Sequence, residues 1–129
     1  MKNFNYNETV ILVGGSRVSL DLLKPISHLH PIFAADSGAN ILVSEKIDFR
    51  AVIGDMDSID KDILKNPDIE NIPIADQNST DLEKCLSQVS AEIFIGFGFL
   101  DLRLDHTLAS LTAICKNDSA SAIILVGEL

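Results

Sequence analysis

Short apolar segments alternate with helical patterns along the whole chain. Most of these segments are continuous runs rich in Ile, Val, Ala or Phe, and few alternate polar with apolar residues. Runs of this kind are typical of strands that are covered on both faces, as in a parallel sheet. Strands are therefore predicted at residues 9–13, 31–35, 51–53, 71–74, 92–95 and 122–126.

The segments between these strands carry apolar residues at helical spacing. Helices are predicted at residues 20–29, 39–46, 58–66, 80–90 and 104–116. Pro25 should break or kink the first helix, and Ser58 should cap the third. The apolar face of the last helix is predicted to consist of Leu104, Leu108, Leu111 and Cys115.

Strands that alternate with helices imply an open parallel α/β sheet. We predict one domain, residues 1–129, with a three-layer, Rossmann-like fold: a mostly parallel sheet of about six strands with helices on both faces. A chain of 129 residues can bury one such core and is too short for two domains of ordinary size. Ligands bind beyond the carboxyl ends of the strands in such sheets, so the residues that directly follow each strand are the informative ones.

Acidic residues and glycines gather at these strand ends. The segments that follow the first five strands are Gly14-Gly15-Ser16-Arg17, Asp36-Ser37-Gly38-Ala39-Asn40, Gly54-Asp55-Met56-Asp57-Ser58, Asp76-Gln77-Asn78-Ser79-Thr80-Asp81, and Gly96-Phe97-Gly98 with Arg103-Leu104-Asp105-His106 beyond it. Between residues 71 and 114, Lys84 and Arg103 are the only Lys or Arg residues. The predicted ligand edge is therefore acidic.

Asp55 and Asp57 flank a single residue at the end of the third strand. Two carboxylates so placed can bind one Mg²⁺, which prefers oxygen ligands and usually takes one or two carboxylates together with substrate phosphates. The alternative is an ordinary acidic turn in which Asp57 caps the helix that begins near Ser58.

Asp81 follows Thr80 at the start of the fourth predicted helix. Thr80 and Glu83 have the spacing of a capping box, and Asp81 complements the helix dipole, so a purely structural role is one interpretation. The other makes Asp81 a further acid at the ligand edge, where a helix N-terminus also binds phosphates. Arg103 is a candidate for an anionic ligand or for a surface salt bridge with Asp101 or Asp105.

The net charge of −9 limits the possible partners. Binding to nucleic acid rests on Lys and Arg that neutralise phosphates, so neither nucleic acid nor an anionic membrane is expected as a partner. A polyphosphate ligand would need a bridging cation. No segment has the length of a membrane span, and a cytoplasmic location is the default. Cys85 and Cys115 are both expected to be buried and unpaired.

Four segments together resemble the thiamine pyrophosphokinases in order and spacing, over roughly residues 9–127. They are Asp36-Ser37-Gly38-Ala39-Asn40, Gly54-Asp55-Met56-Asp57-Ser58, Ser79-Thr80-Asp81-Leu82-Glu83-Lys84 and Arg103-Leu104-Asp105-His106-Thr107-Leu108. Each segment alone is a weak signal. Four in order, each after a predicted strand, are specific.

The resemblance implies a Mg²⁺-dependent transfer of a pyrophosphoryl group from ATP to thiamine, which yields thiamine diphosphate and AMP. The acids that match the family's Mg²⁺ and ATP positions are Asp36, Asp55, Asp57, Asp81 and Asp105. Three other residues match family positions near the nucleotide or its phosphates: Gln77, Thr80 and Arg103. We assign the metal to Asp55, Asp57 and Asp81, with Asp105 as a further catalytic acid. Gly15 and Arg17, after the first strand, are added to the nucleotide-binding set.

The family's enzymes are homodimers in which thiamine lies between the catalytic domain of one subunit and an all-β domain of the other. That C-terminal domain is expected to be absent from this chain, which would then be inactive alone. Ser37 stands where the family usually has a first Gly, and Asp101-Leu102 stand where it usually has Gly-Gly.

Two other functions fit parts of the pattern. An apolar strand that ends in Asp55-Met56-Asp57 is similar to the nucleophile motif of haloacid-dehalogenase-like phosphatases, although Ile59 stands where that family has Thr or Val. The domain could also be a non-catalytic nucleotide-binding or dimerisation module. Mg²⁺-dependent ATP binding would separate the last alternative from the kinase.

Overall fold

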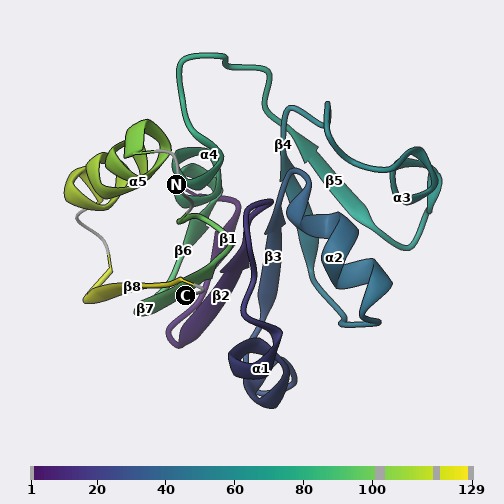
Figure 1. The fold of residues 1–129 in the computed structure, drawn as a ribbon, viewed down its shortest axis with the longest axis horizontal. Helices are drawn as coiled ribbons and strands as arrows, with labels where there is room; N and C mark the ends of the chain where they lie inside the picture. Colours follow the sequence, from purple (N-terminus) through teal and green to yellow (C-terminus); the bar gives the residue numbers. More distant parts are fainter. Residues whose placement is uncertain (1, 101–103, 118–119, 128–129) are drawn as a thin grey trace.

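A computed structural model describes residues 2–100, 104–117 and 120–127 of the chain. Six strands form one sheet in the order β5-β4-β3-β2-β7-β8, and every neighbouring pair is parallel (Figure 1). They are β2 (Thr9–Val13), β3 (Ile32–Ala35), β4 (Ala51–Gly54), β5 (Glu70–Pro73), β7 (Ile93–Phe97) and β8 (Ala122–Val126). The six predicted strands and their parallel pairing are confirmed, with ends that differ by one or two residues.

The helices lie between these strands in the sequence. They are α1 (Leu20–Leu23), the 3₁₀ turn η1 (Lys24–Ile26), α2 (Gly38–Ser44), α3 (Lys61–Lys65), α4 (Asp81–Gln88) and α5 (Leu104–Lys116). The predicted interruption at Pro25 is confirmed, because the α-helix ends at Leu23 and Pro25 lies in the 3₁₀ turn. No helix in the described ranges is long and apolar enough to cross a membrane.

Successive residues of the central strands enter two different hydrophobic clusters. Val10 and Leu12 of β2 belong to a cluster that includes Leu82 of α4 and Ala113 of α5. Ile11 and Val13 belong to the other cluster, which includes Leu23, Leu42 and Ile63 of α1, α2 and α3. Because side chains alternate along a strand, the sheet is covered on both faces, and this is why β2 is apolar at almost every position.

The strand order reverses beside β2. From β2 the chain proceeds outward through β3, β4 and β5, and it then returns to the other side of β2 with β7 and β8. Val13, at the end of β2, pairs with Ala34 on one side and with Phe97 on the other. The loops that leave β2, β3 and β7 therefore diverge at this point, which is where open α/β sheets bind ligands.

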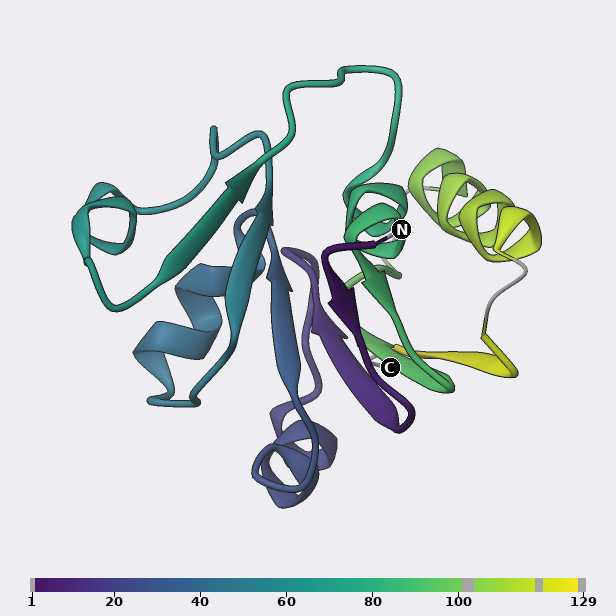
Figure 2. The same ribbon diagram turned by 180° about the vertical axis from the view of Figure 1, so that it is seen from behind.

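A second, two-stranded parallel sheet was not predicted. It pairs β1 (Phe4–Asn5) with β6 (Val89–Ser90), and Figure 2 shows β1 in dark purple near the N-terminus. The Phe4 ring contacts Phe33 edge-on, with centroids 4.9 Å apart. The Arg50 guanidinium lies over the Phe4 ring, 5.0 Å from its centroid, and pairs with Glu70. The sheet thus attaches the polar N-terminal segment to the core.

The third helix begins later than predicted. Its N-cap is Asp60 rather than Ser58, because the Asn40 side chain binds the backbone before it. Asn40 Nδ2 donates to the Ser58 carbonyl at 3.0 Å, and Asn40 Oδ1 accepts from the Asp60 N–H at 2.9 Å. These two bonds hold residues 58–60 outside the helix.

The last helix has the predicted bounds but buries a different face. Ala113 and Ser110 are buried, whereas Leu108 and Leu111 are exposed, and the side chain of Leu104 lies outside the described residues. Cys115 is exposed and Cys85 is buried, and neither forms a disulfide. The prediction that both thiols are buried was therefore wrong for Cys115, which is two residues from Ala113 and on the opposite side of the helix.

Candidate nucleotide and metal site

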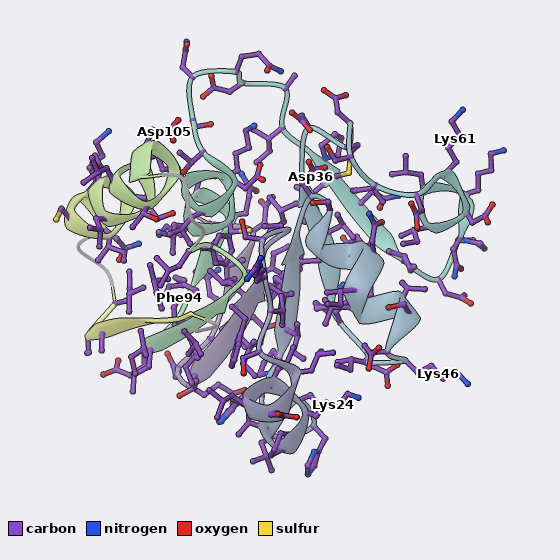
Figure 3. All side chains as sticks on the ribbon, viewed as in Figure 1. Lys24, Asp36, Lys46, Lys61, Phe94 and Asp105 are labelled. Atoms are coloured by element: carbon purple, nitrogen blue, oxygen red, sulfur yellow. The ribbon has the colours of Figure 1, made fainter. Side chains whose placement is uncertain are left out.

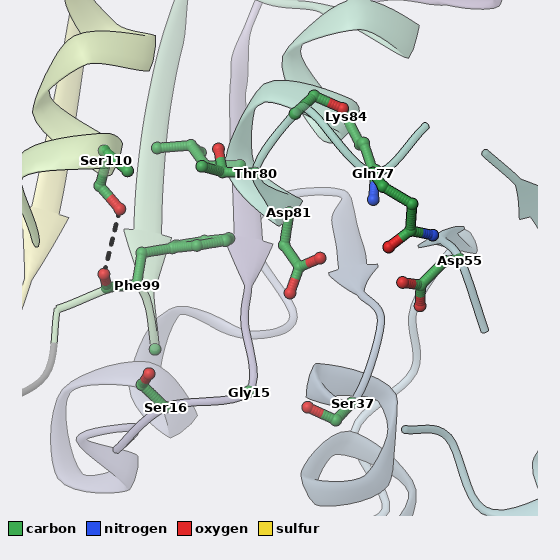
Figure 4. A pocket seen from close by; sticks show the side chains of 14 residues that line it. Gly15, Ser16, Ser37, Asp55, Gln77, Thr80, Asp81, Lys84, Phe99 and Ser110 are labelled. Carbon is green, nitrogen blue, oxygen red and sulfur yellow. Dashed lines mark hydrogen bonds between the residues drawn. The ribbon is translucent and has the colours of Figure 1, made fainter. Parts of the chain in front are cut away.

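A cleft of about 410 Å³ lies at the carboxyl ends of the central strands. Its walls come from the loops after β2, β3, β4 and β7, from the loop that leads into α4, and from α4 and α5 themselves (Figure 4). Of the residues predicted from sequence, it brings together Gly15, Asp55, Gln77, Thr80 and Asp81. Figure 4 shows the carboxylates of Asp81 and Asp55 pointing into the same space.

The N-terminus of α4 forms one wall of the cleft. Thr80 has extended backbone angles, and its Oγ1 accepts a hydrogen bond from the Glu83 N–H at 3.1 Å. The predicted cap is therefore present. It fixes the first turn of α4, and this places Asp81 at the rim of the cleft. The structural and ligand-binding interpretations of this segment are compatible.

The loop before α4 is shaped by its own side chains. Asp76 Oδ1 accepts a hydrogen bond from the Asn78 N–H at 2.8 Å, and Gln77 Nε2 donates to the Ala75 carbonyl at 3.2 Å. The Asn78 N–H, then the Ser79 side chain, and last the charge of Lys84 lower the pKa of the Asp76 carboxyl. Local bonds of this kind are typical of Asx turns, and here they present Gln77 to the cleft.

Asp55 and Asp57 lie in a tight turn after β4. Asp55 Oδ1 accepts the Asp57 N–H at 3.0 Å, and Met56 between them has a positive φ of 70°. Asp57 is exposed and does not cap α3, whose N-cap is Asp60. In the structural alternative, the acidic turn is therefore present, and the part in which Asp57 caps the helix was wrong.

Asp36 lies behind this wall, at the end of β3, and is only 6% exposed. Figure 3 shows it near the centre of the molecule. Its Oδ1 has no hydrogen-bond partner among the described residues. Burial raises the pKa of the Asp36 carboxyl, and the charges of Asp81 and Asp55 raise it further, against an opposing hydrogen bond from the Ser58 backbone.

The space for Asp36 depends on Gly54. A Cβ at Gly54 would lie 3.1 Å from the Asp36 Cβ, and the φ of Gly54 is +153°, which side chains rarely adopt. Gly54 thus lets Asp36 approach the turn that contains Asp55.

The residues present fit a Mg²⁺ ion that arrives with a phosphate ligand. Within the described ranges no group of three or more His, Cys, Asp or Glu side chains is arranged to hold a metal by itself. Mg²⁺ rarely needs such a group, since it keeps several waters and takes one or two carboxylates plus substrate phosphates. The donors here are all hard carboxylate oxygens, and a buried one, Asp36 Oδ1, has no described partner.

The other predicted site residues lie elsewhere. Arg17 and Asp105 are exposed and do not line the cleft. Asp36 and Asp57 do not line it either. Asp105 lies in the first turn of α5 (Figure 3). Arg103 and Asp101-Leu102 lie outside the described residues.

Lys84, Phe99 and Ser110 are among the cleft residues that were not predicted from the sequence as site residues. Lys84 of α4 is buried, with 4% exposure, and Ser110 of α5 donates from its Oγ to the Phe99 carbonyl at 3.2 Å. The signal for Lys84 was available, because it is one of two Lys or Arg residues between positions 71 and 114 and follows Asp81 by three residues. Ser110 and Phe99 carry no such signal.

The fold and the cleft define an open parallel α/β domain with a cleft at the switch point of the sheet, the place where such domains bind ligands. Residues 23–126 match the model of a protein family described as "Thiamin pyrophosphokinase, catalytic domain". The chain therefore belongs to the thiamin pyrophosphokinase catalytic-domain family.

Solved structures of this family have the same fold. The thiamine pyrophosphokinase of Bacillus subtilis is 24% identical, with a TM-score of 0.74, over 92% of this chain and 60% of its own. That of Geobacillus thermodenitrificans is 22% identical, with a TM-score of 0.72 over 92% and 59%. That of Candida albicans is 14% identical, with a TM-score of 0.74 over 95% and 62%. The chain thus spans about three fifths of these relatives. No curated protein matches it.

Proposed function

We propose that this chain is the nucleotide-binding and catalytic part of an enzyme that transfers a pyrophosphoryl group from ATP to thiamine. The observation that carries the proposal is the convergence of Asp55 and Asp81 on one cleft at the switch point of a family member's sheet. The buried Asp36 lies close enough for both charges to raise the pKa of its carboxyl. We further propose that the domain is a three-layer, Rossmann-like fold and that it binds its nucleotide in the way that such folds do. The nucleotide would then lie across the switch point.

In the proposed reaction the hydroxyl oxygen of thiamine attacks the β-phosphorus of ATP. A new P–O bond forms, the bond from the β-phosphorus to the α,β-bridging oxygen breaks, and AMP leaves with that oxygen. The hydroxyl proton passes to a carboxylate or through it to water. Transfers of this class depend mostly on positioning and on neutralising phosphate charge.

The chain's own residues would position the reactants. Asp55, Asp57 and Asp81 would hold Mg²⁺, which supplies positive charge to the phosphate oxygens when it is bound. Asp105 is proposed as a further catalytic acid. Gly15, Arg17, Asp36, Gln77, Thr80 and Arg103 are the proposed nucleotide-binding residues.

The location of Gly15, Gln77 and Thr80 on the cleft wall supports this assignment, since these residues bracket the space into which Asp55 and Asp81 point. Membership of the family favours this function over the haloacid-dehalogenase-like alternative. We also propose that the enzyme is a homodimer and that its thiamine pocket includes residues that correspond to the part of the relatives' chains that this sequence does not cover.

Isothermal titration of ATP tests the proposal directly. With Mg²⁺ present, we expect binding that weakens by roughly tenfold or more in excess chelator, because the phosphates would otherwise meet uncompensated carboxylates. Asp55→Asn should remove most of the Mg²⁺ dependence. Asp48→Asn, an exposed acid outside the cleft, is the matched control and should change nothing. Equal affinity with and without metal would contradict the proposed metal site.

A further inference from the structure

One charged side chain in the cleft has no role in the proposed function so far. Lys84 lies on α4 and lines the cleft, and only 4% of its surface is exposed. Figure 4 shows its amine end pointing from α4 into the space beside Gln77 and Asp55. Across the described residues, ion pairs are formed by Lys24 and Arg50, and none involves Lys84.

Lys84 is a buried residue that forms no ion pair with the described residues. Lysine is rarely buried unless it is paired, because an ammonium loses its hydration when it leaves water. The charge of Lys84 is felt at Asp76, but that carboxylate is exposed and its main partners are Asn78 and Ser79. The packing of α4 therefore holds a positive charge in the cleft that forms no ion pair with any described residue.

The cleft is lined by side chains of opposite charge. Asp55 and Asp81 contribute negative charge, and Lys84 contributes positive charge from α4, whose N-terminus also opens onto the cleft. One simple anion or one cation satisfies only part of this arrangement. A metal-bound oligophosphate satisfies all of it, since some of its oxygens bind the metal while others remain anionic.

We propose that Lys84 binds a phosphate oxygen that the metal does not take, and that the cleft therefore recognises a magnesium oligophosphate chain rather than a single phosphate. The proposal rests on the proposed function, because it requires a nucleotide's phosphates in this cleft. A lysine of this kind acts as a point charge toward phosphate. Its contact helps to align the chain for attack and adds an anchor that is independent of the nucleoside.

A purely structural Lys84 makes the opposite prediction for stability. If its role is packing, then Lys84→Met or Lys84→Gln should destabilise the protein. If its charge is held for a ligand, then Lys84→Met should keep or raise the melting temperature without ligand, because an unpaired buried charge is replaced by an apolar side chain of similar length. The two roles are thus separated before any ligand is added.

The test uses inorganic triphosphate, pyrophosphate and phosphate, each with Mg²⁺, in isothermal titrations of wild type, Lys84→Met, Lys84→Gln and Lys61→Met. Lys61 is an exposed lysine on α3, far from the cleft lining, and serves as the matched control (Figure 3). Triphosphate should bind wild type and Lys61→Met equally, and both Lys84 variants roughly tenfold to a hundredfold more weakly. Phosphate should bind wild type roughly tenfold or more weakly than triphosphate.

The outcomes distinguish the two proposals. Wild-type affinity in the folded Lys84 variants would overturn the role of Lys84 and leave the proposed function standing. Absence of any Mg²⁺-dependent triphosphate binding by wild type would overturn both. A fall in melting temperature in both Lys84 variants would assign the residue to packing and overturn the inference.

Discussion

Gly15 and Ser37 lie in contact where the loops after β2 and β3 meet. A Cβ added at Gly15 would lie 1.9 Å from Ser37 Oγ and 3.3 Å from Ser37 Cβ. The contact exists because Ser37 carries a side chain, which a glycine at this position would lack. The bare backbone of Gly15 is what leaves room for the serine side chain at the floor of the cleft.

We predict that Gly15→Ala lowers the free energy of unfolding by about 1–3 kcal/mol, because the added methyl group overpacks this contact. Rotation of the Ser37 hydroxyl relieves the shorter distance but leaves the contact with its Cβ. The measurement is urea unfolding of a double-mutant cycle. Ser37→Gly should recover most of the loss in the Gly15→Ala background and should cost little by itself. Additive losses in the double variant would contradict the contact.

The Asp36 carboxylate, whose Oδ1 has no described hydrogen-bond partner, makes a second prediction. In excess chelator, Asp36→Asn should raise the free energy of unfolding by about 1 kcal/mol or more, because the amide removes a buried charge that lies near Asp55 and Asp81. Urea unfolding at neutral pH measures this difference. Asp48→Asn, at an exposed position, is the control and should be neutral.

The same substitution should weaken nucleotide binding in the presence of Mg²⁺. A gain in stability together with a loss of binding would assign Asp36 to the ligand site. If Asp36→Asn lowers stability in chelator, then the hydrogen bond from the Ser58 backbone outweighs the repulsion by the nearby acids, and the proposed role of Asp36 in binding the nucleotide loses its main support.

The strands and the cleft were predictable because both follow from local patterns. A strand covered on both faces is apolar at nearly every position, as β2 is, and in a parallel sheet the residues after each strand reach a common edge. This reasoning was enough to select Gly15, Asp55, Gln77, Thr80 and Asp81. The Thr80 cap was also predictable, since the bond from the Glu83 N–H depends only on residues three apart.

Other features depend on contacts between distant segments. The two-residue strands β1 and β6 are too short to show a period, and they pair residues that are 85 positions apart. The start of α3 is set by Asn40, which the sequence around Ser58 does not reveal. In α5 the larger side chains of Leu108 and Leu111 suggested the wrong buried face. The burial of Lys84 follows from the packing of α4 and not from its own sequence.

The two cysteines should differ in reactivity. Burial raises the pKa of the Cys85 thiol, and the charge of Asp81 raises it further, while Cys115 is exposed on α5. A thiol reacts as the thiolate and only when reagent can reach it. We expect a maleimide reagent to label Cys115 rapidly in the native protein and Cys85 only after denaturation. Mass spectrometry of the labelled peptides measures this, and Cys115→Ser should remove native labelling. Rapid labelling of Cys85 in that variant would contradict the buried position of α4's inner face.

The last prediction concerns what these 129 residues can do by themselves. The chain spans 59% to 62% of the solved thiamine pyrophosphokinases with which it shares a fold. Its cleft of about 410 Å³ is near the lower end of the range of roughly 300–1,000 Å³ that accommodates drug-sized ligands. One nucleotide with its metal would fill most of this space. The thiamine would then need a surface beyond the residues in this chain.

We therefore expect the purified 129-residue chain to bind Mg²⁺-ATP and to form no measurable thiamine diphosphate or AMP when thiamine is added. Chromatography of both products measures the reaction, and the thiamine pyrophosphokinase of Bacillus subtilis is the positive control. ATP binding without product would agree with a nucleotide site that is complete and an acceptor site that is not. Sustained formation of both products by this chain would show that the acceptor site lies within it, because no other protein surface is then present to hold thiamine beside the β-phosphorus.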